Sequence, residues 1–312
     1  MSPRSTPVVP HIGANTNQAS RRSLLASAAA LALTGCTVNP DSDHQGADAP
    51  STAPLARTPR VAWVLSSGGP RGFVHVGVLK ALHELGLKPD LIVGASAGAL
   101  VGSLFAARMP IALLERTALE MPAWKLARLN LGSGERLSGG ALADMVRELV
   151  QEHAGVSTLE RLPMMMVCAA QRLADGVVVG FNRGDVGLAV QAAAAIEGQF
   201  APVRIRGQRY ADADLRMPLP VRLARALGAT RVMAVDASAF EDKAPAGTEH
   251  WREGDLRKRA LTLPDARLAD VLLHPDIGYY ANITREYRER VIEAGYRATL
   301  AQAASLRAMH VL

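Results

Sequence analysis

The residues with the clearest chemical potential form a Gly-Ala-Ser-Ala-Gly pentapeptide at positions 94–98. A short apolar run at 91–93 precedes it and an Ala- and Leu-rich helical stretch follows, so the pattern predicts a tight turn between a strand and a helix. Glycines two positions before and after Ser96 leave its hydroxyl uncrowded at a helix N-terminus. The spacing therefore predicts that Ser96 is a nucleophile for acyl transfer.

A nucleophile that attacks a carbonyl also needs hydrogen-bond donors for the oxyanion that develops. A glycine-rich turn at 68–72 follows an apolar run at 61–65 and opens a helical pattern that Gly86 closes. Pro70 has no N–H group and cannot donate. The remaining candidate donors are the backbone amides of Gly68, Gly69, Arg71 and Gly72. The competing interpretation, a nucleotide-phosphate loop, lacks the Gly-Lys-Ser/Thr sequence and the acidic residue that would bind a ribose.

The elements that must position these turns alternate between strands and helices. The pattern predicts further helices at about 141–152 and 221–227, strands at 164–170, 177–181 and 232–235, and a closing helix from about residue 284. Strand, helix, strand, helix at this spacing favours an α/β fold, a three-layer αβα sandwich around a mainly parallel sheet. No repeat and no second linker interrupts this pattern, so one folded domain is expected over 59–312.

With these motifs, the sequence resembles the patatin-like phospholipase family. Members of that family combine a glycine-rich oxyanion loop, a Gly-x-Ser-x-Gly elbow, and an Asp-Gly-Gly motif that supplies a catalytic aspartate without any histidine. The resemblance extends through residues 66–79, 91–102, 192–203 and 209–235. It implies a patatin-like fold and makes Asp212 the base that accepts the proton of Ser96. It also implies a serine acyl hydrolase that cleaves carboxylic esters of lipids or phospholipids through an acyl-enzyme, with no cofactor.

The sequence departs from the family pattern at a few positions. Ala213 and Asp214 stand where the Asp-Gly-Gly motif has its two glycines. Glu197 stands where proline is usual, and Ser67 replaces the first glycine of the oxyanion loop. A positive φ at Ala213 would cost about 1 kcal/mol or more of strain. The charge of Asp214 is expected to perturb the pKa of Asp212.

Two other functions stay open at this point. One is a Ser-His-Asp esterase that uses His274, and the other is a catalytically lapsed patatin-fold lipoprotein that binds lipid. His153, His274 and His310 have no metal-ligand spacing, so no metal site is predicted. Cys168 lies in the apolar run 164–170 and is predicted to be a core residue.

The first 35 residues resemble a lipoprotein signal peptide. The pair Arg21-Arg22 precedes an apolar Ala/Leu run that is too short to span a bilayer. The pair resembles a twin-arginine export signal, although basic residues also occur there in signals for the general route. Small residues before Cys36 resemble a lipobox, so Cys36 is expected to carry lipid and to become the mature N-terminus.

The stretch after the lipobox contains hardly any large apolar residue, so residues 36–58 are expected to form a flexible tether. The net charge of +6 falls to about +3 without the signal peptide, which suits an anionic membrane surface and gives no support for nucleic-acid binding. Thr37, rather than an acidic residue, follows the cysteine, as in lipoproteins sent to the outer membrane. The expected location is therefore the periplasmic face of a bacterial outer membrane, with a lipid ester as substrate.

Overall fold

The computed structural model describes residues 42–122, 128–129 and 137–311. The predicted signal peptide and Cys36 lie outside the described residues. The strands are β1 (Val61–Leu65), β2 (Leu91–Ala95), β3 (Arg128–Leu129), β4 (Leu137–Ser138), β5 (Met165–Arg172), β6 (Val178–Phe181), β7 (Val203–Ile205), β8 (Gln208–Asp212), β9 (Arg231–Val235) and β10 (Val271–Leu273).

The central sheet has eight strands in the order β10-β9-β1-β2-β5-β8-β7, and β6 also pairs with β5. Pairing is parallel from β10 to β5 and antiparallel where β6, β7 and β8 join. The predicted mainly parallel sheet is confirmed. The antiparallel pair β7–β8 was not expected, and β8 is the strand that ends at Asp212.

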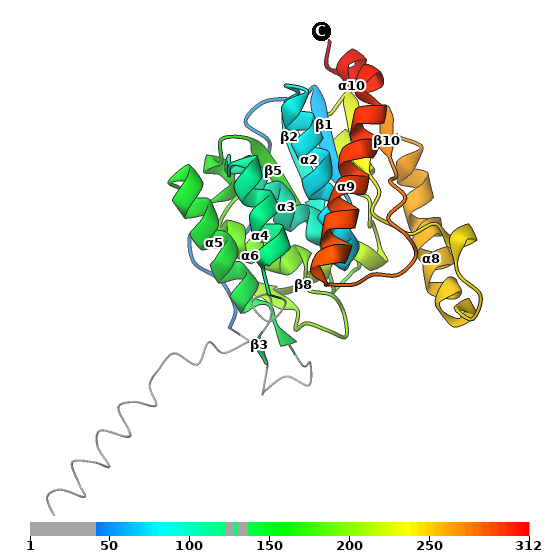
Figure 1. Cartoon of the computed structure of the whole chain (residues 1–312). Helices are drawn as coiled ribbons and strands as arrows, with labels where there is room; N and C mark the ends of the chain where they lie inside the picture. Colours follow the sequence, from blue (N-terminus) through cyan, green and yellow to red (C-terminus); the bar gives the residue numbers. More distant parts are fainter. Residues whose placement is uncertain (1–41, 123–127, 130–136, 312) are drawn as a thin grey trace, which may run out of the picture. The chain divides into compact units, whose positions relative to one another are not determined.

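Helices cover both faces of this sheet (Figure 1). The α-helices are α2 (Val74–Glu84), α3 (Ala97–Ala106), α4 (Ile111–Glu120), α5 (Gly140–Ala154), α6 (Val186–Ala193), α7 (Val221–Ala226), α8 (Glu249–Ala266), α9 (Arg285–Ala301) and α10 (Ala303–His310). Short 3₁₀ turns are η1 (Gly69–Phe73), η3 (Leu159–Arg161), η4 (Ala213–Leu215) and η5 (Glu241–Lys243). Among the described helices, none combines the length and apolarity needed to cross a bilayer.

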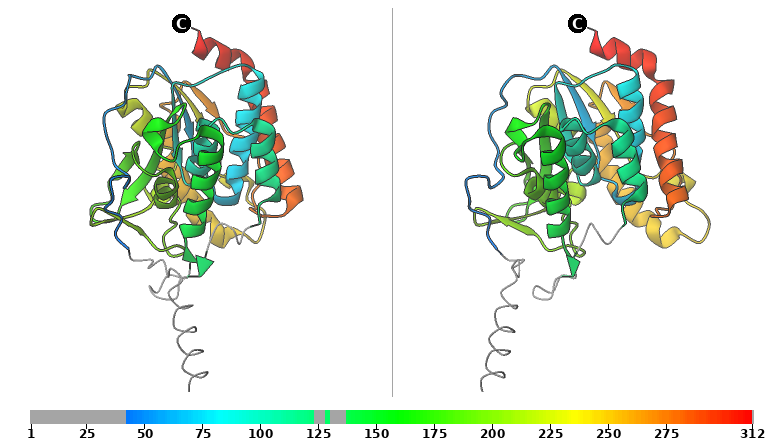
Figure 2. Two further views of the ribbon diagram at one scale, coloured as in Figure 1. Left: turned by 90° about the vertical axis from the view of Figure 1, so that its left-hand side faces the viewer. Right: turned by 60° about the vertical axis from the view of Figure 1, so that its left-hand side comes forward.

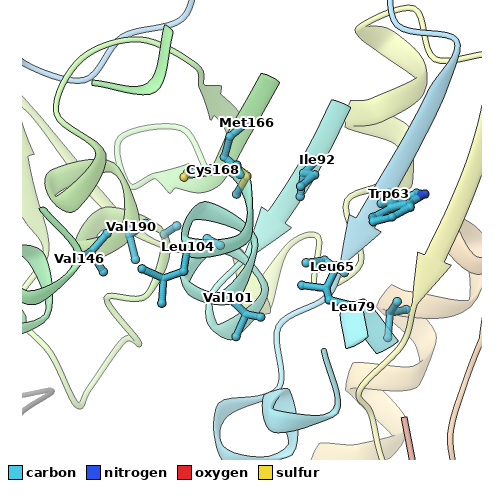
Figure 3. Packing of buried hydrophobic residues seen from close by; sticks show 14 of the residues in the cluster. Trp63, Leu65, Leu79, Ile92, Val101, Leu104, Val146, Met166, Cys168 and Val190 are labelled. Carbon is cyan, nitrogen blue, oxygen red and sulfur yellow. The ribbon is translucent and has the colours of Figure 1, made fainter. Parts of the chain in front are cut away.

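The alternation of side chains along β1 explains the three layers. Trp63 and Leu65 belong to the larger apolar cluster, together with residues of α2, α3, α5, α6 and α9. Ala62 and Val64 point to the other face, into a second cluster that includes residues of α7 and α8. Successive strand residues face opposite sides, so a strand buried on both faces is apolar throughout. Figure 3 shows the larger cluster, in which Cys168 is fully buried, as its sequence context predicted.

Helix α9 lies directly against α2, as both views in Figure 2 show. A Cβ atom at Gly77 of α2 would lie 1.8 Å from the carbonyl oxygen of Ile292, and one at Gly295 of α9 would lie 2.3 Å from that of Val74. The two helices therefore approach each other through glycines, backbone against backbone. This contact fixes α2, whose first residue directly follows the glycine-rich turn η1.

The segment predicted as a tether, residues 36–58, is attached to the domain from its described start at residue 42. A backbone bridge joins His44 to the edge strand β7. The side chain of Asn182 accepts a 2.8 Å hydrogen bond from the Ala53 amide and donates a 2.7 Å bond to the Ala53 carbonyl. A polar segment can form hydrogen bonds with the unpaired backbone N–H and C=O groups at the edge of a sheet without burying apolar side chains. The prediction of a flexible tether is therefore corrected for its described part.

Candidate active site

Ser96 sits at a sharp turn between β2 and α3, as the pentapeptide predicted. Its φ of 51° and ψ of −121° are unusual for a residue other than glycine, and such strain is typical of a nucleophile elbow. A Cβ atom at Gly94 would lie 2.5 Å from the backbone of Gly98. One at Gly98 would lie 2.2 Å from the Leu65 carbonyl oxygen on β1. Both glycines are thus required for the turn to close against the sheet.

Strand register brings Asp212 beside the serine. Strand β5 pairs with β2 up to Ala95, which lies opposite Ala169. The next β5 residue, Ala170, lies opposite Asp212 of β8. Strand β6 pairs with one edge of β5 over Cys168–Gln171. Strands β2 and β8 must therefore share the opposite edge of β5, one after the other. The end of β8 therefore meets the end of β2, where Ser96 begins the turn.

The last residue of α6 and the segment directly after it hold the backbones of Ser96 and Asp212. The amide of Ser96 donates to the carbonyl of Ala193 at 3.1 Å, and the amide of Asp212 donates to the carbonyl of Ala195 at 2.9 Å. Glu197, which replaces the usual proline, is exposed just beyond this segment. The carboxylate of Glu197 is therefore exposed to solvent and is not buried in the site.

The Asp212 carboxyl is only 2% exposed, and this burial raises its pKa to about 7. The nearby Ser96 hydroxyl and the Asp214 backbone amide oppose the rise in the pKa, while the negative charge of Asp214 adds to it. Oδ1 accepts the Asp214 amide at 2.9 Å. Oδ2 is buried and has no partner of good hydrogen-bond geometry among the described residues. A carboxylate with this pKa and an open oxygen can take a proton at neutral pH.

Asp214 belongs to a small network with Lys258 of α8 and Ser67 of the oxyanion turn. Lys258 Nζ donates to Asp214 Oδ1 at 2.7 Å, and the Ser67 hydroxyl donates to the same oxygen. Burial alone would raise the pKa of Asp214, but the charge and hydrogen bond of Lys258, assisted by Ser67, lower it below its ordinary value. Sequence reasoning did not find Lys258, because a polar helix far along the chain carries no motif.

The replacements in the Asp-Gly-Gly motif cause no backbone strain. Ser96, Arg108 and Arg206 are the residues other than glycine with positive φ in the described chain. Ala213 is therefore free of the strain that a positive φ would have caused, and it is buried in the 3₁₀ turn η4. The expected influence of Asp214 on the base is present and raises the pKa of Asp212.

The predicted oxyanion loop forms the turn η1 next to the elbow. Gly69 has a φ of +53°, and a Cβ atom at Gly72 would lie 2.2 Å from the Cβ of Ala97, the residue after the nucleophile. The Arg71 amide donates to the Gly68 carbonyl at 3.0 Å, so it is engaged within the turn itself. The amides of Gly68 and Gly69 donate to no backbone carbonyl in the described part of the chain. The oxyanion role of Gly68, Gly69 and Gly72 stays a prediction, and the structure places all three residues in or directly before the turn η1.

A neutral histidine supports this turn from behind. His75 is fully buried, and burial lowers its pKa to about 4. Its Nε2 therefore donates to the Ser66 carbonyl at 2.9 Å. The Ser66 hydroxyl in turn accepts the Ala237 amide at 2.8 Å. The turn is thus fastened to α2 on one side and to the residues after β9 on the other.

The remaining titratable candidates do not join the site. His274 Nε2 lies 3.0 Å from the Ser238 carbonyl, and its ring stacks on Phe240 at 3.9 Å. Burial raises the pKa of the Cys168 thiol to about 12, so it is not a nucleophile. The described residues contain no group of His, Cys, Asp and Glu side chains arranged to hold a metal ion.

An α/β sheet with a strained serine beside a buried carboxyl defines the class of this protein. The sequence model of the patatin-like phospholipases matches residues 63–225, more than half of the 312 residues. The chain therefore belongs to the patatin-like phospholipase family, as its motifs indicated.

Several known proteins are similar to it. An uncharacterized NTE family protein of Mycobacterium tuberculosis is 33% identical over 206 residues, which cover 62% of this chain and 55% of that protein. A lysophospholipase of Emericella nidulans is 26% identical over 198 residues, 60% of this chain and 12% of that protein. The chain thus spans about half the length of the mycobacterial relatives. The crystal structure of VipD from Legionella pneumophila aligns with a TM-score of 0.45 at 14% identity, over 88% of this chain and 73% of that one.

Proposed function

We propose that this protein is a lipid acyl hydrolase that cleaves carboxylic ester bonds of phospholipids with Ser96 as nucleophile and Asp212 as base. The observation that carries the proposal is a strained serine at a helix N-terminus beside a buried carboxyl whose pKa is raised to about 7. Membership of the patatin-like phospholipase family and the similarity to a lysophospholipase support the choice of substrate.

The acylation step needs only groups that meet at this turn. Asp212 takes the proton of the Ser96 hydroxyl while Oγ attacks the ester carbonyl carbon, which gives a tetrahedral oxyanion. The amides of Gly68 and Gly69 donate hydrogen bonds to that oxyanion. When the intermediate collapses, the C–O bond of the leaving alcohol breaks and Asp212 returns the proton to it. The products of this step are a lysolipid or alcohol and an acyl group esterified to Ser96.

Deacylation repeats the same sequence with water. Asp212 accepts a proton from a water molecule, whose oxygen attacks the acyl carbonyl, and the second oxyanion uses the same amides. Collapse breaks the bond to Ser96 Oγ, which regains its proton from Asp212, and a fatty acid leaves. One carboxyl therefore serves as base and acid in both halves, and this requires a pKa near the working pH.

Labelling with a fluorophosphonate followed by assays on phospholipids and short-chain esters tests this proposal. Ser96→Ala is expected to abolish both labelling and hydrolysis, because no second nucleophile lies at the elbow. A folded wild-type protein that neither reacts with the probe nor hydrolyses any ester would favour the lapsed lipid-binding alternative. Loss of activity in a folded His274→Ala variant would instead favour the histidine triad.

We also propose that the protein is exported and held at a membrane by lipid on Cys36, on the periplasmic face of the outer membrane. The support is the lipobox-like sequence before Cys36 and the absence of an acidic residue after it. Three acyl chains on one cysteine would anchor the protein stably, whereas one chain gives only marginal binding. Mass spectrometry of the mature N-terminus tests this, and an unlipidated N-terminus at any other residue would exclude the anchor.

A further inference from the structure

A cleft of about 360 Å³ adjoins the oxyanion turn, and Arg71, Trp251, Asp255, Tyr279 and Tyr280 line it. These residues come from three parts of the chain: the turn η1, the first half of α8, and the loop that precedes α9. Because Arg71 belongs to the turn η1, a group bound in the cleft would contact the same turn that holds the predicted oxyanion donors.

The cleft contains one cation and one anion that do not pair with each other. Arg71 Nη2 donates to the Tyr279 carbonyl at 2.6 Å, and its Nε is buried without a hydrogen-bond partner. Asp255 Oδ2 accepts the Tyr279 hydroxyl at 2.5 Å. Among the described residues, neither side chain forms a salt bridge, although Lys258 and Arg259 on the same helix do. The charge of Arg71 does act on Asp214, whose pKa it helps to lower. The two unpaired charges suit a ligand that carries both signs.

Aromatic rings complete the lining. The rings of Tyr279 and Tyr280 lie 5.5 Å apart at 82°, so the buried ring of Tyr279 supports the exposed ring of Tyr280 from the side. Trp251 is 61% exposed and Tyr280 is 57% exposed, which is unusual for side chains of this size. Aromatic faces attract quaternary and primary ammonium groups, with tryptophan the strongest.

We propose that this cleft binds the zwitterionic headgroup of a phospholipid, with the phosphate on Arg71 and the ammonium between Trp251, Tyr280 and Asp255. Nη2 of Arg71 donates to Tyr279 and Nε is buried, so Nη1 is the nitrogen that would donate to a phosphate oxygen. A hydrogen bond from a charged guanidinium to phosphate is stronger than one between neutral groups. Diacylglycerols and glycolipids lack both charges, and phosphatidylglycerol lacks the ammonium. The proposal rests on the proposed hydrolase function and adds the class of headgroup that the enzyme prefers.

Direct binding tests the cleft without relying on catalysis. The full chain carrying Ser96→Ala is titrated with glycerophosphocholine, glycerol 3-phosphate and choline, and heat or ligand NMR signals are measured. Glycerophosphocholine is expected to bind about tenfold more tightly than either fragment, and Asp255→Asn or Trp251→Ala to weaken it by about tenfold. Leu256→Ala, an exposed change on the same helix, is the matched control. Equal binding of all three compounds, or no saturable binding, would overturn the proposal.

Hydrolysis of dissolved lipids separates headgroup recognition from contact with a membrane surface. Dihexanoyl phosphatidylcholine, phosphatidylethanolamine and phosphatidylglycerol are compared as monomers. The two zwitterionic lipids are expected to have the lower KM, and Asp255→Asn to remove that difference. If Trp251→Ala slows only the hydrolysis of vesicles and leaves the monomer KM unchanged, Trp251 is a membrane contact and the proposal is wrong. A wild-type protein that cleaves no ester would refute the hydrolase function, while the binding experiment still decides the cleft.

Discussion

Ser96 and Asp212 lie side by side, yet the structure positions them by different physical means. Backbone geometry holds the serine, because Gly94 and Gly98 allow the closest contacts and Ser96 itself adopts a positive φ. Burial and charge set the properties of the aspartate, because burial raises its pKa most, the charge of Asp214 raises it further and Lys258 lowers it. Changes on the serine side should therefore act on turnover through geometry, whereas changes around the aspartate should shift the pH at which the enzyme works.

The largest effect is expected from Asp212→Asn, which removes the base. We expect hydrolysis to fall by about 10³-fold or more, comparable with the loss of a catalytic carboxylate elsewhere. Steady-state kinetics on a soluble ester measures this. Asp175→Asn, a change to an exposed aspartate paired with Arg172, is the matched control. Substantial residual activity in a folded Asp212→Asn variant would contradict the assignment of the base.

The same variant should gain stability, and the sign follows from the pKa of about 7 in the folded state against 3.8 in the unfolded state. Below about pH 4 both states hold the proton. As the pH rises toward 7, the unfolded state ionises first, so the native protein loses stability across this window. Asparagine avoids this loss and should stabilise the protein by up to a few kcal/mol at pH 8, and by little at pH 4. Denaturant unfolding at the two pH values measures the difference.

Gly69→Val tests the geometric side of the comparison. A valine at φ +53° should displace the amides of the oxyanion turn and lower kcat by about 10²- to 10³-fold, with less effect on KM. Gly86→Val is a matched control, because Gly86 also has a positive φ and open space around it but lies at the far end of α2. It should cost stability and leave kcat unchanged. Equal kcat in both variants would place the oxyanion donors elsewhere.

Asp214→Asn sharpens the electrostatic side. It removes a negative charge that raises the pKa of Asp212 and leaves the positive charge of Lys258 nearby. The lost negative charge and the remaining positive charge both favour ionised Asp212, so its pKa should fall. The acidic limb of the pH–rate profile should then move to lower pH, and the rate at the acidic end should rise about threefold or more. Glu253→Gln, an exposed change on α8, should leave the profile in place. An unmoved profile in Asp214→Asn would show that this network does not influence the base.

The same contrast explains what the sequence could predict. The apolar runs of β1, β2, β5 and β9 and the glycine spacing around Ser96 depend on local patterns, and the structure has strands and an elbow at those places. The part of the sheet that carries Asp212 consists of short strands with polar residues, so no periodicity indicates it. Only the resemblance to a family pointed to that residue.

No local sequence pattern could predict the charge contacts between residues far apart in the chain. Lys258 lies 44 residues after Asp214 on a helix without a strong apolar face, so its role depends on how α8 packs over the sheet. The attachment of the segment around Ala53 escaped prediction for a similar reason. It rests on hydrogen bonds to Asn182, whereas composition only reports how little apolar surface a segment can bury.

The pH dependence of fluorophosphonate labelling at Ser96 tests the central claim most directly, because it reports the nucleophile and its base without substrate binding. We predict a labelling rate that rises with pH through one ionisation near pH 7, the pKa of Asp212. The same ionisation should be absent from the slow residual labelling of Asp212→Asn. A wild-type rate that does not change between about pH 5 and about pH 9, or an unaltered profile in Asp212→Asn, would contradict the account.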